Sequence, residues 1–209
     1  MNQTIIDALK IITGDKGQAG AFSSWTNTGS AIIRRGLTTG YKQSTAIAST
    51  TLAVDITSAT ATTCFGQFIS PALRAQTISG TVTGYARMSI ANVTGATVQS
   101  RVKITVINSA GTVVATLVAL TAGASNLTTT LTSYQILNAA AISSYSCANG
   151  DRLCVEVGIG RSVGTTARNG TISFGSSSAT NITAAGSTTA NNPVLTFSGN
   201  LLFYQGTTD

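Results

Sequence analysis

Short segments in which every second residue is apolar constrain the fold of this chain most strongly. In residues 101–106, two valines and an isoleucine fall on one face of a strand, and polar residues fall on the other. Residues 153–159 repeat the pattern with Leu, Val, Val and Ile at alternate positions. The Asn-Gly-Asp sequence at residues 149–151 is a strong turn signal, because Asn and Gly tolerate a positive φ angle. These segments predict antiparallel strands with one buried face.

Segments rich in threonine and aliphatic residues recur from about residue 46 and are separated by short turns. Residues 108–111 form such a turn between two strands, which predicts a hairpin. Eight or nine strands at this spacing predict an all-β fold, an antiparallel β-sandwich that is jelly-roll-like. We expect this domain over residues 46–209, with a polar loop at residues 176–192. The predicted strands are Ala46–Ile56, Thr62–Ser70, Thr77–Ala91, Arg101–Val106, Thr112–Ala119, Leu127–Leu137, Leu153–Ile159, Arg168–Phe174 and Val194–Tyr204.

The first 45 residues form a separate unit in this prediction. Ile5, Ala8, Leu9 and Ile12 have the spacing of an amphipathic helix. Residues 13–45 carry many Gly, Ser and Thr and predict an extended arm with one or two short strands. A helix this short is marginal alone, so it docks either on its own domain or on a neighbouring subunit. The candidate partner-docking residues are Ile5, Leu9, Ile12, Trp25, Arg34 and Arg35.

Charged residues make up 9% of the chain, against about 25% in an ordinary soluble domain. Two explanations fit: Ser and Thr hydroxyls keep the surface soluble, or partner chains cover much of it. The net charge is +6, and Arg34-Arg35 is the only adjacent basic pair. Nucleic-acid-binding proteins have a clustered basic stripe with interleaved aromatic residues, so we expect no nucleic-acid partner. The positive charge either favours docking on an acidic protein surface or only keeps the protein in solution.

The chain has no histidine and only six acidic residues, which argues against catalysis. A turn accounts for Asp151, and pairing across a sheet on the outward face of a strand accounts for Glu156. Cys64, Cys147 and Cys154 lack metal-binding spacing, so we expect no metal and no cofactor. They are interpreted as small apolar fillers, with a Cys147–Cys154 disulfide as the alternative. The sequence therefore predicts a protein that is not an enzyme.

The N-terminal segment does not have the composition of a secretion signal. Asp7 and Lys10 interrupt its apolar run. No stretch approaches the roughly 20 apolar residues of a membrane-spanning helix. We therefore expect a protein that is made in the cytoplasm and has no membrane partner.

An ordered set of short motifs runs from residue 68 to residue 204. FISPAL at residues 68–73 is followed by AQTISGTV at residues 75–82. Further along are SAGTVVA at 109–115, GDRL at 150–153, TISFG at 171–175, and NP at 192–193 ahead of FS at 197–198. In their order and spacing these motifs resemble a β-sandwich of tailed-bacteriophage virion proteins, in which a serine-proline step leads into a T-I-S-G strand. The resemblance covers about two-thirds of the chain, without the first 60 residues. It implies a structural role in the virus particle and brings no catalytic residues.

Composition and resemblance together predict a virion structural protein. The specific prediction is a capsid decoration (cement) protein, a homotrimer that binds the major capsid protein and stabilises the head through many weak contacts. The alternative is a tail, neck or fibre component that binds a glycan or receptor. Sugar-binding sites usually stack the sugar on exposed aromatic rings, and the five tyrosines show no cluster in the sequence. Both interpretations place the protein in the virion.

Overall fold

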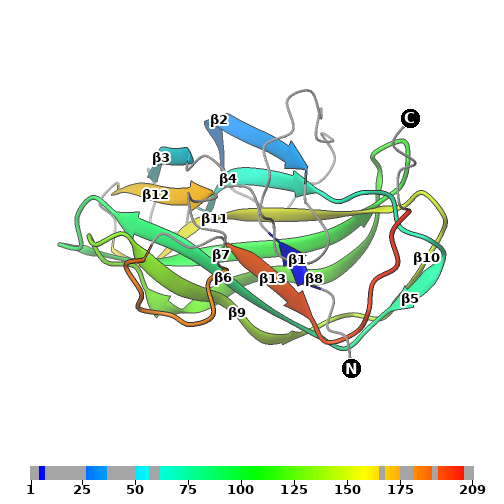
Figure 1. Cartoon of the computed structure of the whole chain (residues 1–209). Coiled ribbons are helices and arrows are strands. Elements are labelled where there is room, and N and C mark those ends of the chain that lie inside the picture. Colours follow the sequence, from blue (N-terminus) through cyan, green and yellow to red (C-terminus); the bar gives the residue numbers. More distant parts are fainter. Residues whose placement is uncertain are drawn as a thin grey trace.

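The structure is a computed structural model of the 209-residue chain, and it describes residues 5–7, 27–36, 50–56, 62–164, 168–174, 181–189 and 193–204. Within these residues the fold is all-β and contains no helix. Two larger sheets face each other, and a two-stranded sheet lies at one end (Figure 1). The predicted all-β fold is confirmed for this part of the chain, and all strand pairs but one are antiparallel.

Ten strands pair as one long ribbon that is folded back on itself. They are β3 (Thr50–Ile56), β4 (Thr62–Ile69), β5 (Gln76–Ile78), β6 (Thr81–Ile90), β7 (Ala96–Ile107), β8 (Val113–Asn126), β9 (Thr132–Ala141), β10 (Tyr145–Cys147), β11 (Arg152–Gly164) and β12 (Arg168–Phe174). β7 and β8 form the hairpin at the tip, as predicted, and the Asn108 amide donates to the Thr112 carbonyl across the turn at 2.9 Å. Moving away from the tip, β6 pairs with β9, β5 with β10, β4 with β11 and β3 with β12. The pairs are therefore nested, with the first strand of the ribbon beside the last.

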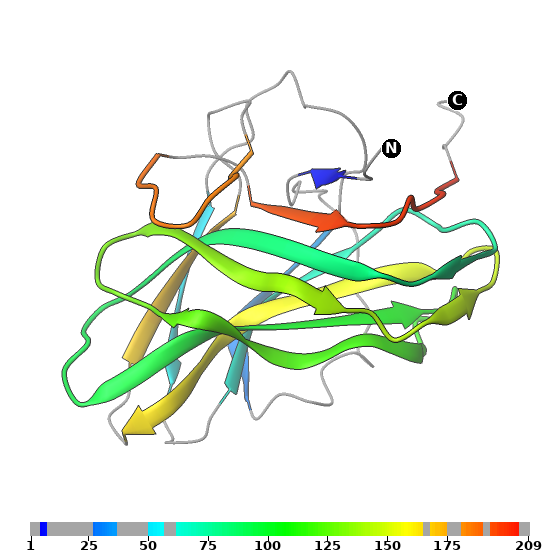
Figure 2. The same ribbon diagram turned by 90° about the horizontal axis from the view of Figure 1, so that it is seen from below.

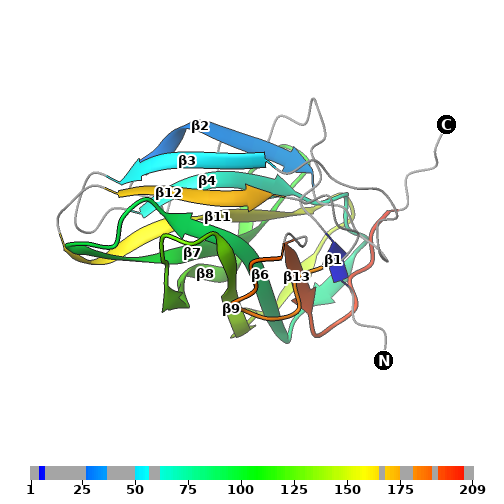
Figure 3. The same cartoon turned by 60° about the vertical axis from the view of Figure 1, so that its left-hand side comes forward.

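Wrapping this ribbon divides eight of its strands between the two larger sheets, and β5 and β10 form the two-stranded sheet. The five-stranded sheet has the order β2-β4-β11-β7-β8, where β2 (Asn27–Gly36) runs parallel to β4. In the six-stranded sheet, β6 pairs with β9 along one edge and with both β12 and β13 (Val194–Phe197) along the other. β3 pairs with the far edge of β12, and β1 (Ile5–Asp7) pairs with the far edge of β13. At one side of the molecule β3 contacts β4 and β2 (Figure 3), and at the other side β8 contacts β9.

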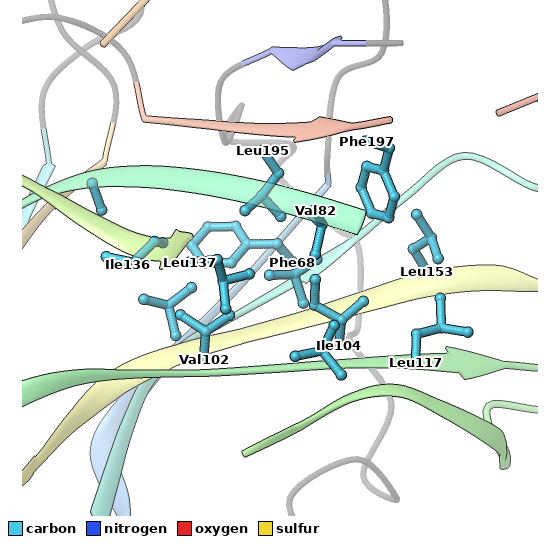
Figure 4. Close-up of a cluster of buried hydrophobic side chains, with 14 of the residues drawn as sticks. Phe68, Val82, Val102, Ile104, Leu117, Ile136, Leu137, Leu153, Leu195 and Phe197 are labelled. Atoms are coloured by element: carbon cyan, nitrogen blue, oxygen red, sulfur yellow. The ribbon is translucent and has the colours of Figure 1, made fainter. Parts of the chain in front are cut away.

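The hydrophobic core lies between the two sheets (Figure 4). Val102 and Ile104 of β7 face Val82 of β6 and Leu195 of β13, and Phe68 of β4 lies among them. Complete burial of one such side chain stabilises the folded state by about 1.5–3 kcal/mol. The apolar faces predicted for residues 101–106 and 153–159 are confirmed. Their buried members are Val102, Ile104, Val106, Leu153, Val155, Val157 and Ile159.

The structure corrects the predicted N-terminal helix at the residues that it describes. Ile5–Asp7, which we expected in the helix, form β1 and pair with residues 194–196 of β13. A short helix has little stability of its own, whereas the edge of β13 offers unpaired backbone groups, and isoleucine favours strands. Residues 8–15 lie outside the described part of the chain.

Four strands are longer than the sequence predicted, among them β7 and β11, which extend at both ends beyond residues 101–106 and 153–159. β2 has ten residues, although we expected only short strands in the arm. β8 continues to Asn126, beyond the predicted end at Ala119. β8 is extended by pairing with the 12-residue strand β7, and β2 pairs with β4 through residues 27–28 and 33–36. The domain boundary that we expected between residues 45 and 46 stays a prediction. β2 precedes this boundary in the sequence, but it is part of the five-stranded sheet.

Candidate interaction surface

Most charged side chains that the structure describes are buried. Lysine, arginine, aspartate and glutamate are almost never fully buried unless they are paired. Here six of them have at most 9% of their surface exposed: Arg87, Lys103, Asp151, Glu156, Arg161 and Arg168. Arg101 and Arg152 are half-buried, and among the described side chains only Arg74 carries an exposed charge. The described surface therefore consists mainly of hydroxyl, amide and methyl groups.

Three buried polar residues lie side by side across the five-stranded sheet. Glu156 of β11 pairs in register with Gln67 of β4 on one side and with Lys103 of β7 on the other. Gln67 Nε2 donates a hydrogen bond to Glu156 Oε1 at 3.2 Å. Phe68 and Val155, the next residues along their strands, point into the core, so the three polar side chains point away from it. We call Gln67, Glu156 and Lys103 the buried row.

The buried row continues toward one predicted docking residue. Arg34 of β2 lies opposite Gln67 in the parallel ladder, and Arg35 lies opposite Phe68. Along this register line, Arg34 and Lys103 stand on either side of Glu156. The predicted outward position and cross-strand pairing of Glu156 are confirmed. Its complete burial, at 0% exposure, was not predicted.

The three cysteines are free and buried. Cys154 packs with Ile69 and Ile107, and Cys147 belongs to the main core, so both act as small apolar fillers. The alternative Cys147–Cys154 disulfide is absent. Burial, together with the nearby charge of Glu156, raises the pKa of the Cys64 and Cys154 thiols well above the ordinary value. Both remain protonated at neutral pH and are poor nucleophiles.

On the outer face of the six-stranded sheet, a polar loop covers another buried charge. Residues 181–189, part of the predicted polar loop, lie beside β9 and β6 (orange in Figure 2). Arg87 donates to the carbonyl oxygens of Leu131 at 3.5 Å and Thr188 at 3.0 Å. Ser133 of β9 exchanges backbone hydrogen bonds with the loop at Gly186 and Ser187. Arg87 therefore holds the loop in place and adds little charge to the surface.

An exposed patch of larger side chains lies at the end of the molecule near β5 and β10. Leu202 is 53% exposed and Tyr204 is 42% exposed. The Arg74 guanidinium lies over the Tyr204 ring, 5.8 Å from its centre. Gln76 holds the backbone of Leu202 from both sides, donating to its carbonyl at 2.6 Å and accepting from its amide at 2.8 Å. We call Arg74, Leu202 and Tyr204 the end patch, which the sequence pattern did not reveal.

The structure places only some of the predicted docking residues. Ile5 lies in β1 of the six-stranded sheet, and Arg34 and Arg35 lie in β2 of the five-stranded sheet. Leu9, Ile12 and Trp25 lie outside the described residues. The structure thus does not bring Ile5 together with the arginine pair in one sheet, and the docking role of these residues stays a prediction.

The described residues contain no group of three or more His, Cys, Asp or Glu side chains that could hold a metal ion. In the same part of the chain, no helix has the length and apolarity needed to cross a membrane.

No protein-family model matches the chain, and no curated protein matches it. Among solved structures, it is similar to a chain from the structure of infectious bursal disease virus, Gt strain, with 16% sequence identity and a TM-score of 0.36. The similarity covers 73% of this chain but 34% of the viral chain, so this chain spans about a third of the protein it matches. This structural likeness is weak.

Proposed function

We propose that this protein is a structural subunit of a bacteriophage particle and that its fold is a jelly roll. The nested pairs β3–β12, β4–β11, β6–β9 and β7–β8 support the fold. Wrapping a ribbon of eight strands in this way gives the two facing sheets of a jelly roll, an architecture that viral capsids use. The ordered motifs of residues 68–204, which resemble those of phage virion proteins, support the same origin.

The distribution of charge is the observation that carries this proposal. Surface charge normally keeps soluble proteins apart. In this chain most described charges are buried, and the exposed surface consists of small, uncharged groups. Interface cores are depleted in charged residues, so such a surface suits repeated contact between subunits in a shell.

We propose further that the protein carries out no catalysis. Asp151 accepts a hydrogen bond from the Ala148 amide at 2.9 Å, which holds the turn before β11. Glu156 accepts from Gln67 within the buried row. Cys64 and Cys154 are protonated at neutral pH. These acids and thiols therefore serve the fold.

Within the particle, a capsid decoration protein is the position that we favour. A homotrimer of this domain would stand on the shell and bind the major capsid protein through many weak contacts. The end patch has the composition of an interaction hot spot, because arginine and tyrosine are enriched at such sites. Its positive charge suits an acidic surface on the shell, and Ile5, Leu9, Ile12, Trp25, Arg34 and Arg35 remain candidate docking residues.

Gold-labelled antibodies against the purified chain test this proposal on particles of the virus that encodes it. Label distributed regularly over the heads is the expected result. Label confined to tails or fibres would support the alternative position. Particles that contain none of the protein by mass spectrometry would refute a structural role.

The alternative of a receptor-binding tail or fibre component has one observation in its favour. Tyr204 is exposed, and the Arg74 guanidinium lies over its ring. Sugars bind to aromatic rings that polar groups flank. A glycan array with the purified protein, with Tyr204→Ser as the control variant, tests this function. Binding that the substitution abolishes would favour a receptor-binding role over decoration.

A further inference from the structure

The outer face of the five-stranded sheet is buried, although no described strand packs across it. β11 lies in the middle of this sheet, and the strands in extensive contact with it are its sheet neighbours β4 and β7. Side chains that stand on one sheet stay partly exposed unless a second layer covers them. The side chains that point outward here have at most 3% of their surface exposed. They are Gln67, Ile69, Lys103, Thr105, Ile107, Cys154 and Glu156.

Part of this face is apolar. Ile69, Ile107 and Cys154 pack together, with the partly buried Val113 against them. This group is separate from the main core between the sheets. We call these four residues the outer cluster. Because water is excluded from the outer cluster and the described strands lie beside it, the atoms that cover it belong to another part of the chain.

Only two stretches outside the described residues are longer than six residues, and both adjoin β2. Residues 8–26 enter β2 at Asn27, which lies opposite Thr63 near the start of β4. Residues 37–49 leave β2 after Gly36, which lies opposite Ile69. The second stretch therefore begins one strand away from the outer cluster, whereas the first joins the sheet at its opposite end.

The length of residues 37–49 also exceeds what the connection needs. β2 and β3 contact each other and run in opposite directions (Figure 3). A loop of about two to five residues is usual between such strands. The remaining residues are enough to cross the neighbouring strands β4 and β11. Their composition fits the face, because Leu37, Tyr41 and Ile47 are apolar and Lys42 is the only charged residue among them.

We propose that residues 37–49 of the same chain dock on the outer face of the five-stranded sheet. Their apolar side chains cover the outer cluster, and Lys42 brings a positive charge to the side of the sheet that holds Glu156. This inference does not depend on the proposed function. It means that each copy of the chain occupies this face itself, so partners bind elsewhere.

The reactivity of Cys154 tests the proposal. Deleting residues 39–47 leaves Leu37, Thr38, Ala48 and Ser49 to join β2 to β3. We expect iodoacetamide to modify Cys154 in this variant at least about tenfold faster than in the wild type, because a buried thiol reacts only after it is uncovered. Cys147 belongs to the main core and is the internal control, so its rate should not change. A Cys154 that stays as protected as in the wild type, in a variant that is folded by circular dichroism, would overturn the proposal.

Cross-linking in the full-length chain tests the same contact without a deletion, and it decides the question if the shortened chain does not fold. Leu37→Cys, Tyr41→Cys and Ile47→Cys are oxidised singly with copper phenanthroline, and the linked peptides are identified by mass spectrometry. We expect at least one of them to form a disulfide with Cys154 within one copy, which requires Cα atoms about 4.4–6.8 Å apart. Val163→Cys, at the exposed far end of β11, is the matched control and should not react with Cys154. No link from any of the three positions, or links only between two copies, would contradict docking within the chain.

Discussion

Glu156→Gln is the substitution that tests the buried row most directly. Glutamine has nearly the same shape as glutamate and keeps an oxygen that accepts the hydrogen bond from Gln67 Nε2. The substitution therefore removes the negative charge opposite Lys103 and leaves the packing in place. Lys103 is only 3% exposed, so water does not replace the lost countercharge.

The size of the effect follows from burial. Two unit charges about 4 Å apart interact by about 4 kcal/mol at an effective dielectric constant of about 20. Removing one partner of a buried pair costs about 3–5 kcal/mol, because the other charge stays buried without compensation. We expect this loss in the free energy of unfolding, out of a total of about 5–15 kcal/mol for a domain. Lys103→Met should cost a similar amount, since it leaves Glu156 uncompensated.

Urea unfolding of the two single variants and the double variant measures the coupling between Glu156 and Lys103. The double variant should lose at least about 2 kcal/mol less than the sum of the two single losses, because it contains no uncompensated charge. Arg74→Gln is the control for removing an exposed charge and should cost less than about 1 kcal/mol. A loss below about 1 kcal/mol for Glu156→Gln, or additive losses in the double variant, would refute this account of the buried row.

Three further predictions concern backbone conformation and the thiols. Ala139 has a φ of 43°, a left-handed conformation that glycine adopts more readily than alanine. Ala139→Gly should therefore raise the free energy of unfolding by up to about 1 kcal/mol, and a variant with a lower thermal midpoint than the wild type would contradict this. Gly150 and Gly164 have φ angles of 92° and 91°, but only at Gly164 would a Cβ collide with a neighbouring backbone carbonyl. Gly164→Ala should therefore destabilise more than Gly150→Ala in urea unfolding, and equal losses would contradict the steric argument. The pKa of the Cys64 and Cys154 thiols is raised on folding, so the stability they contribute is complete below their ordinary pKa of 9.0 and falls as the pH rises above it. The free energy of unfolding should fall by up to about 1.4 kcal/mol for each thiol and each pH unit. Replacing both cysteines by alanine should make this pH dependence weaker, and an unchanged slope would count against the prediction.

Some of the fold was predictable because it depends on local patterns. Alternation in residues 101–106 and 153–159 identified two central strands and the faces that they bury. The turn at residues 149–151 was predictable because Gly150 needs a positive φ angle. Isoleucines at helical spacing, by contrast, misled the prediction for Ile5–Asp7, because the partner strand β13 lies nearly 190 residues further along the chain.

The sequence by itself determined that the described part of this chain is all-β and that the chain has few charges, because strand periodicity and composition are local properties of the chain. Only the tertiary structure decided where those charges lie. A lysine or glutamate at an alternate strand position predicts a solvent-facing side chain, since burying a lone charge is costly. Lys103 and Glu156 are buried because β7, β11 and β4 bring them into register with each other and with Gln67, and no local pattern encodes that pairing.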